Sequence, residues 1–200
     1  KKVECVSESY QTESQLEMNL IKNLESQGYE RLIARSNKDL YKNLRVQIER
    51  LNDVKFSDEE WSRLLVEYLD CPNDGLIEKT RKIQENHIYD FVFDDGHVKN
   101  IKIIDKKNIH NNFLQVTNQI TAEGKKKSRY DVTILVNGLP LVHIELKKRG
   151  VNLHEAFNQI HRYSKESFNS DNSLYKYVQI FVISNGTYTS CLLYTSLSGL

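Results

Sequence analysis

The chain has few prolines, glycines and cysteines, and it contains no long hydrophobic run. Only 2 Pro and 8 Gly occur in 200 residues, which argues against long flexible linkers. The three cysteines are widely separated and form no C-x-x-C pair, so we expect neither a disulfide framework nor a zinc site. This usage fits a reducing, intracellular compartment. No run of about eighteen apolar residues is present, so no membrane-spanning helix is expected, and the first residues show no signal-peptide pattern.

Several chemical motifs are also missing. There is no G-x-x-x-x-G-K-[ST] phosphate loop, so the chain is not itself an ATP-driven motor. The six histidines show neither H-x-x-x-H nor H-E-x-x-H spacing, and no nucleophile elbow surrounds a serine or a cysteine. The net charge is only +1, whereas DNA-binding modules are usually more basic. We therefore expect any contact with DNA to be local, or to be completed by a partner.

Apolar residues recur at helical spacing in the first part of the chain. Ser14 with Glu17 resembles a capping box at the start of a first helix, and Ser57 with Glu60 resembles a second box further along. The expected helices cover residues 14–27, 39–51, a stretch starting at 57, then 76–84 and 153–167.

Extended apolar runs predict strands in the second part of the chain. They cover residues 88–93, 98–104, 113–120, 129–136, 141–147 and 177–184. Helices followed by antiparallel strands, then one more helix and strand, predict a mixed α/β (α+β) domain with helices flanking a central mixed sheet. A helical part should run from about residue 10 to 85 and a sheet core from 86 to 187.

The segment 129–147 predicts a hairpin, because two alternating strands flank an Asn-Gly turn signal. A three-residue loop, 137–139, would place Asp131 directly opposite Glu145, with β-carbons roughly 4.5–5.5 Å apart. One face of the hairpin is aliphatic, with Val132, Ile134, Val136, Val142, Ile144 and Leu146; the other carries Asp131, Thr133, His143, Glu145 and Lys147.

This polar face outlines a site for phosphodiester hydrolysis. Two carboxylates as close as Asp131 and Glu145 raise each other's pKa, and a bound Mg²⁺ would offset their repulsion. Lys147 lies two residues beyond Glu145 on the same face, where it can reach an attacking water or the phosphate in the transition state. His143, on the same face, is a weaker candidate for supporting the site.

The competing interpretation is a solvated strand face, because charged residues in such positions usually contact only water. Three features favour the nuclease: the strand is apolar up to Glu145, a carboxylate lies opposite it, and basic residues bracket the hairpin. The basic residues are Lys125, Lys126, Lys127, Arg129, Lys148 and Arg149.

A family resemblance adds to this reading. Asp131, followed after a hairpin by Glu145-Leu146-Lys147, resembles the PD-(D/E)xK nuclease pattern. The longer string from Arg129 to Arg149 resembles the N-terminal nuclease domain of the restriction (R) subunit of type I restriction-modification enzymes, in particular the type IC group. The family's helical Gln-x-x-x-Tyr motif is similar to Gln159-Ile-His-Arg-Tyr163. The likeness covers residues 9–187, and 188–200 are expected to be a truncated or non-native tail.

The resemblance implies a PD-(D/E)xK restriction-endonuclease-like core and Mg²⁺-dependent hydrolysis of double-stranded DNA. Asp131 and Glu145 would hold the divalent ion, with the Leu146 carbonyl as a further ligand. Lys147 would orient the water or stabilise the phosphate.

Further residues are implied to assist from neighbouring helices. Gln159 and Tyr163 would support the site and contact DNA, and Arg162 is a candidate phosphate contact. Family members often carry an acidic residue near the metal in the first helix, for which Glu13 and Glu17 are candidates.

The resemblance also implies partners. A helicase-like motor that uses ATP would follow in the same polypeptide, separate subunits would supply specificity and methylation, and the setting would be the prokaryotic cytoplasm. Two other interpretations stay open. One is a non-catalytic module that couples DNA sensing to the motor, and the other is a PD-(D/E)xK repair or junction-resolving nuclease.

Overall fold

The computed structural model describes residues 12–122, 128–166 and 174–193. The predicted basic residues Lys125, Lys126 and Lys127 lie outside the described residues. The backbone at Arg129, Arg162 and Tyr163 is described, but their side chains are not. None of the helices in the described ranges is long and apolar enough to cross a membrane.

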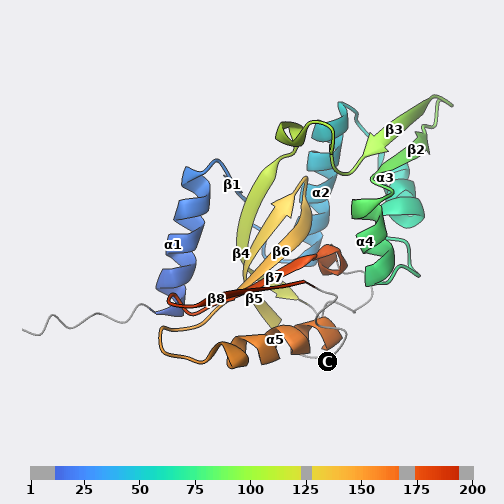
Figure 1. The fold of residues 1–200 in the computed structure, drawn as a ribbon. Coiled ribbons are helices and arrows are strands. Elements are labelled where there is room, and N and C mark those ends of the chain that lie inside the picture. The colour runs from blue at the N-terminus through green and yellow to red at the C-terminus, as the bar shows by residue number, and fades with distance from the viewer. Residues whose placement is uncertain (1–11, 123–127, 167–173, 194–200) are drawn as a thin grey trace, which may run out of the picture.

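A six-stranded mixed sheet forms the centre of the fold, in the order β1-β4-β5-β6-β7-β8 (Figure 1). β1 pairs with β4 and β6 with β7 in parallel, and the other neighbours are antiparallel. The predicted mixed α/β class with a central mixed sheet is therefore confirmed. The strands are β1 (Glu30–Arg31), β4 (Leu114–Ala122), β5 (Ser128–Val136), β6 (Leu139–Leu146), β7 (Ile180–Ser184) and β8 (Thr189–Leu193), with a separate hairpin of β2 (Ile88–Val92) and β3 (Val98–Lys102).

The helices surround this sheet and begin mostly at capping boxes. The Ser57–Glu60 box before α3 is confirmed, but the box at α1 is formed by Thr12 and Gln15 rather than by Ser14 and Glu17. The prediction for α1 was wrong because Glu17 is turned inward. The helices are α1 (Glu13–Ser26), α2 (Asn37–Asn52), α3 (Asp58–Leu64), α4 (Leu76–Gln84) and α5 (Leu153–Glu166); a π-helical turn, η1 (Leu65–Leu69), continues α3, and η2 (Ile109–Asn111) and η3 (Leu174–Tyr177) are 3₁₀ turns.

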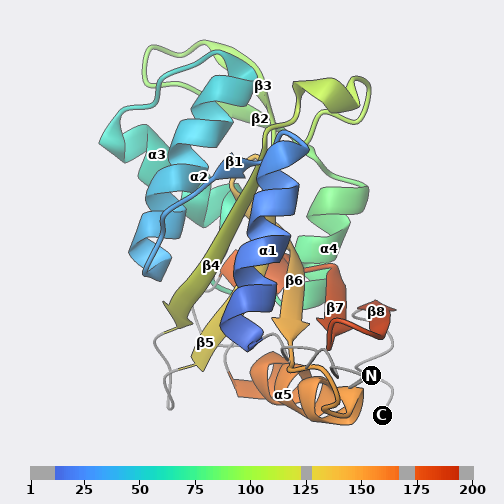
Figure 2. The ribbon, with the colours of Figure 1, turned by 90° about the vertical axis from the view of Figure 1, so that its left-hand side faces the viewer.

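Both faces of the sheet are buried. α1 covers one face, in front of β4, β5 and β6 in Figure 2, with Ile21 and Leu24 packed on Val132 and Ile144. The other face packs in a larger core that contains the apolar stripe of α2 and residues of α5 and η3. A polar side chain on either face of the β5–β6 hairpin is therefore inside the protein.

The β5–β6 register was predicted for the wrong reason. The turn has two residues, Asn137 (φ 52°) and Gly138 (φ 82°), instead of three. This fits a type I′ turn, which suits the twist of the paired strands. An irregularity between Ile134 and Leu135 then shifts the register by one residue, so that Val132 still pairs with Ile144. Asp131 and Glu145 lie next to that pair, on the side away from the turn.

Two strands were not predicted. β1 has only two residues, too few for an alternation, and it is defined by its pairing with β4. β8 is mostly exposed and lacks an apolar face, yet it pairs along its length with β7. The sheet therefore continues past the predicted boundary at residue 187.

We expect Gly138→Ala to destabilise the chain more than Gly96→Ala. Both glycines have positive φ, +82° and +85°, so each alanine costs about 1–2 kcal/mol of backbone strain. A β-carbon on Gly138 would in addition lie 2.7 Å from the Leu44 Cα of α2, whereas one on Gly96 meets nothing within 4 Å. The crowding should add about 1–3 kcal/mol. Equal losses in urea denaturation would show that the turn does not pack on α2.

Candidate active site

The predicted carboxylates lie together where the pairing of β5 with β6 ends, on the side away from the turn. Asp131 and Glu145 come directly after the last β5–β6 pair, Val132 and Ile144, so continuing that register sets them opposite each other. Asp131 is fixed by a hydrogen bond, because the Leu146 N–H donates to its Oδ2 at 2.9 Å. The hairpin therefore holds Asp131 by the backbone that joins Glu145 to Lys147.

Glu145 is fully buried. Its Oε1 accepts a hydrogen bond from Lys147 Nζ at 3.1 Å. Its Oε2 lies 3.5 Å from His143 Nε2 and has no hydrogen-bond donor within the described part of the chain. The alternative of a solvated strand face is wrong, because α5, η3 and the larger core cover this side of the sheet. Burying an ionised carboxylate is costly unless its charge is compensated.

The pKa of Asp131 is raised from its ordinary value to about 7. Burial contributes most, and the neighbouring Glu145 carboxylate adds to it. The hydrogen bond from Leu146 and the charge of Lys147 act in the opposite direction without cancelling the rise. The sequence-based argument that the two carboxylates raise a pKa agrees with this direction.

Lys147 joins the carboxylates to α5. Its Nζ donates to Glu145 and, at 2.8 Å, to Gln159 Oε1, while its own N–H donates to the Ser184 carbonyl of β7 at 2.8 Å. Burial disfavours its charge, but the adjacent Glu145 outweighs that and raises the pKa of Lys147. The ammonium is thus held charged at the wall of a surface pocket of about 330 Å³, lined by Glu13, Lys147, Glu155, Asn158 and Gln159.

The first helix supplies two acidic residues around this site. Glu13 lines the pocket beside Lys147, and its Oε1 accepts from the Lys148 N–H at 3.3 Å. Glu17 is buried and accepts from the side chains of Asn118 and Gln119 on β4. Its charge also raises the pKa of Asp131. The capping box of α1 is made by Thr12 and Gln15, so both carboxylates are left for other contacts: Glu13 lies beside Lys147, and Glu17 lies close enough to Asp131 to affect it electrostatically.

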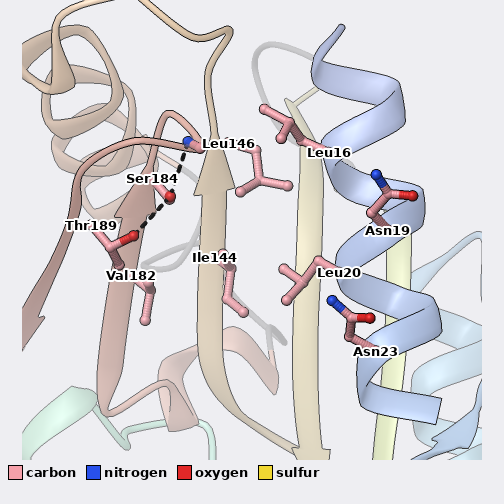
Figure 3. A pocket seen from close by; sticks show the side chains of 10 residues that line it. Leu16, Asn19, Leu20, Asn23, Ile144, Leu146, Val182, Ser184 and Thr189 are labelled. Atoms are coloured by element: carbon pink, nitrogen blue, oxygen red, sulfur yellow. Dashed lines mark hydrogen bonds between the residues drawn. The ribbon is translucent and has the colours of Figure 1, made fainter. Parts of the chain in front are cut away.

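An apolar groove lies behind the site, on the face of the sheet that α1 covers (Figure 3). Leu16 and Leu20 of α1 point toward Ile144 and Leu146 of β6, across a pocket of about 290 Å³. Because Ile144 and Leu146 flank Glu145 along β6, their packing fixes the backbone on both sides of that carboxylate.

His143 lies next to Glu145 on the inner face and is fully buried. Its ring meets Tyr130 edge-to-face, with centroids 5.3 Å apart, and Tyr175 lies on the same side. The predicted proximity of His143 to the site is therefore present in the structure. Asn118 and Gln119 also reach the site, but nothing in their sequence spacing singled them out.

The donor set suits a hard cation. An orphaned carboxylate oxygen on Glu145 and a carboxylate on Asp131 offer oxygen ligands, which Mg²⁺ prefers. Among the described residues no three His, Cys, Asp or Glu side chains are close enough to form a metal cluster on their own. Two carboxylates with a backbone carbonyl and water suit Mg²⁺, which usually keeps several waters.

Comparisons with known proteins identify relatives of the whole described chain. A family model, type I restriction enzyme R protein N terminus (HSDR_N), matches residues 10–194. The chain is 57% identical over 185 residues to the type I restriction enzyme EcoprrI endonuclease subunit of Escherichia coli, covering 92% of this chain and 59% of the relative. It is 39% identical over 186 residues to the SauMSSORF170P endonuclease subunit of Staphylococcus aureus MSSA476, covering 90% and 19% respectively.

We expect Asp131→Asn to remove a pH dependence of stability. The pKa of Asp131 is about 7 when folded and 3.8 in the reference state, so the folded chain binds more protons between these values. The contribution of Asp131 to the free energy of unfolding is thus greatest below about pH 4 and is lost as the pH rises to about 7. Without divalent ions, we expect the asparagine variant to gain about 2 kcal/mol over the parent at pH 8, after discounting for partial exposure.

The measurement is urea denaturation in EDTA across that pH range, with Glu59→Gln, an exposed carboxylate of α3, as the control. If the free energy of unfolding of Asp131→Asn depends on pH as steeply as that of the parent, the raised pKa of Asp131 beside Glu145 is contradicted.

Proposed function

Because the chain belongs to the family of type I restriction enzyme R protein N termini, we propose that it is the Mg²⁺-dependent endonuclease domain of such an R subunit. It would hydrolyse double-stranded DNA without sequence preference at the cut, after ATP-driven translocation by motor domains of the same subunit. Separate specificity and methylation subunits would complete the complex. The observation that carries the proposal is the buried Asp131–Glu145 pair with the Lys147 ammonium hydrogen-bonded to it.

In this proposal Asp131, Glu145 and the Leu146 carbonyl hold the ion. Mg²⁺, when bound, would neutralise the two carboxylates and polarise the scissile phosphate. Asp131 would then be ionised at neutral pH, because a nearby cation lowers a carboxyl pKa. The Leu146 N–H keeps one oxygen of Asp131 in place, so that the second oxygen stays available.

Lys147 acts on the phosphate side of the site. Its ammonium is exposed enough to reach the pocket and is shared between Glu145 and Gln159. A phosphate in the pocket offers it stronger, charge-assisted hydrogen bonds, which gain strength as negative charge develops on the oxygens. Gln159 orients the lysine from α5, which supports a positioning role for the Gln-x-x-x-Tyr motif.

We expect Lys147→Ala to abolish DNA cleavage while ATP-driven translocation persists. Loss of one charged transition-state contact typically costs a factor of about 10² or more in rate. The experiment uses the full-length R subunit assembled with its partner subunits, and it follows translocation and plasmid cleavage in parallel. Lys148→Ala is the matched control, because Lys148 is the next residue along the chain and is exposed. That variant should cut normally.

The other outcomes separate the alternatives. If Lys147→Ala cuts at the parent rate, the carboxylate hairpin is structural and the proposal is wrong. If it loses both cleavage and translocation while Lys148→Ala keeps both, the domain is a coupling module for the motor.

A further inference from the structure

A polar pocket lies at the edge of the sheet where β1 pairs with β4. It has a volume of about 310 Å³ and is lined by residues 31–35, Asn118 and Gln119. The first of these segments runs from β1 toward α2, and the two amides belong to β4. The pocket is distinct from the one at Lys147, with which it shares no lining residue.

Arg31 gives this pocket an unpaired cation. Its Nη2 donates to Asn118 Oδ1, but its Nη1 is buried and meets no acceptor among the described residues. No carboxylate among the described residues forms an ion pair with Arg31 either. The planar guanidinium fits the oxygens of a phosphate group, to which it can donate two parallel hydrogen bonds.

Hydrogen bonds connect the pocket to Glu17 on α1. Asn118 accepts from Arg31 and donates to Glu17, and Gln119 donates to the other oxygen of Glu17 at 3.3 Å. Glu17 in turn acts on Asp131 through its charge. The amides of Asn118 and Gln119 thus turn to the same carboxylate, although consecutive residues of a regular strand point to opposite faces.

Backbone strain at Gln119 makes that arrangement possible. Its φ is +58°, a left-handed conformation that costs a residue with a β-carbon about 1–2 kcal/mol. The strand pairing is interrupted there, between the pairs Asn118–Val132 and Ile120–Tyr130, at the register position opposite Asp131. Strain of this kind is retained mainly where function requires it.

The pocket and the carboxylate site lie within reach of one DNA strand. β1 and β5 flank β4, and Arg31 pairs with Val116, three residues before Gln119, which lies at the register of Asp131. Two strand separations across the sheet and three residues along β4 place the two backbones roughly 14 Å apart. Because the rise is about 3.4 Å per nucleotide along the duplex axis, a few nucleotides of one strand cover that distance. Arg35, exposed at the rim of the pocket, adds a second positive charge.

We propose that the pocket of Arg31, Arg35, Asn118 and Gln119 binds a backbone phosphate of the DNA strand that is cut at the Asp131–Glu145 site. This inference rests on the proposed function, because it takes DNA as the substrate. It explains how a chain with a net charge of +1 grips DNA locally. The contact fixes the strand relative to the carboxylates and reads no base, since phosphates carry no sequence information.

The test measures the salt dependence of DNA binding by the full 200-residue chain in EDTA, using a fluorescein-labelled duplex of arbitrary sequence. Each neutralised phosphate contributes about 0.9 to the slope of log affinity against log salt concentration. We expect Arg31→Gln to lower that slope by about 0.9 and to weaken binding most at low salt. Arg35→Gln, an exposed position that tolerates substitution, should lower the slope in the same direction.

Lys107→Gln is the matched control. It removes the same charge from an exposed residue on the loop before β4, at the other end of that strand from Gln119. The inference is overturned if Arg31→Gln and Arg35→Gln keep the parent slope, or if Lys107→Gln lowers it equally. Unaltered cleavage by Lys147→Ala would instead overturn the proposed function. Absence of salt-dependent DNA binding by the parent chain would overturn both.

Discussion

Asp131 and Glu145 are two carboxylates held close together beyond the last residue pair at the open end of the β5–β6 hairpin, with Glu145 fully buried. Their repulsion in a poorly solvated place is the constraint on which the rest of the site depends. Burial, together with this repulsion, raises the pKa of Asp131 to about 7, and the charge of Glu145 keeps Lys147 charged beside it. Lys147, which Glu145 shares with Gln159, donates only to Oε1 of Glu145. Among the described residues Oε2 has no hydrogen-bond partner, so it is available to bind a cation.

The fold maintains this pair by covering both faces of the hairpin. On the face that α1 covers, Leu16 and Leu20 point toward Ile144 and Leu146, on either side of Glu145 (Figure 3). On the opposite face His143 is fully buried against Tyr130 and Tyr175. The type I′ turn at Asn137 and Gly138 would by itself give another register. The one-residue shift after Ile134 corrects it, so that the carboxylates meet. The buried carboxylate pair therefore destabilises the fold locally, and apolar packing on both faces of the sheet offsets that cost.

Much of this could be predicted from sequence. Alternation in 129–147 predicted the hairpin and its two faces, and the Asn-Gly signal predicted the turn. The family resemblance supplied the roles of Asp131, Glu145 and Lys147, which stay predictions. Burial of the polar face could not be predicted, because it depends on α5 and η3, which pack from far along the chain. Neither the left-handed Gln119 nor the pocket at Arg31 has a sequence signature: Gln119 lies where the β4–β5 pairing is interrupted, and the pocket depends on the parallel pairing of the two-residue strand β1.

The central claim is that the carboxylate pair is held for a divalent cation. Calorimetric titration of MgCl₂ into the chain at about pH 6.5, in two buffers of different ionisation enthalpy, counts the protons released on binding. With the pKa of Asp131 at about 7, binding should release most of one proton, and Asp131→Asn should release none and bind far more weakly. Binding of equal affinity by Asp131→Asn, or no binding by the parent chain, would contradict the account.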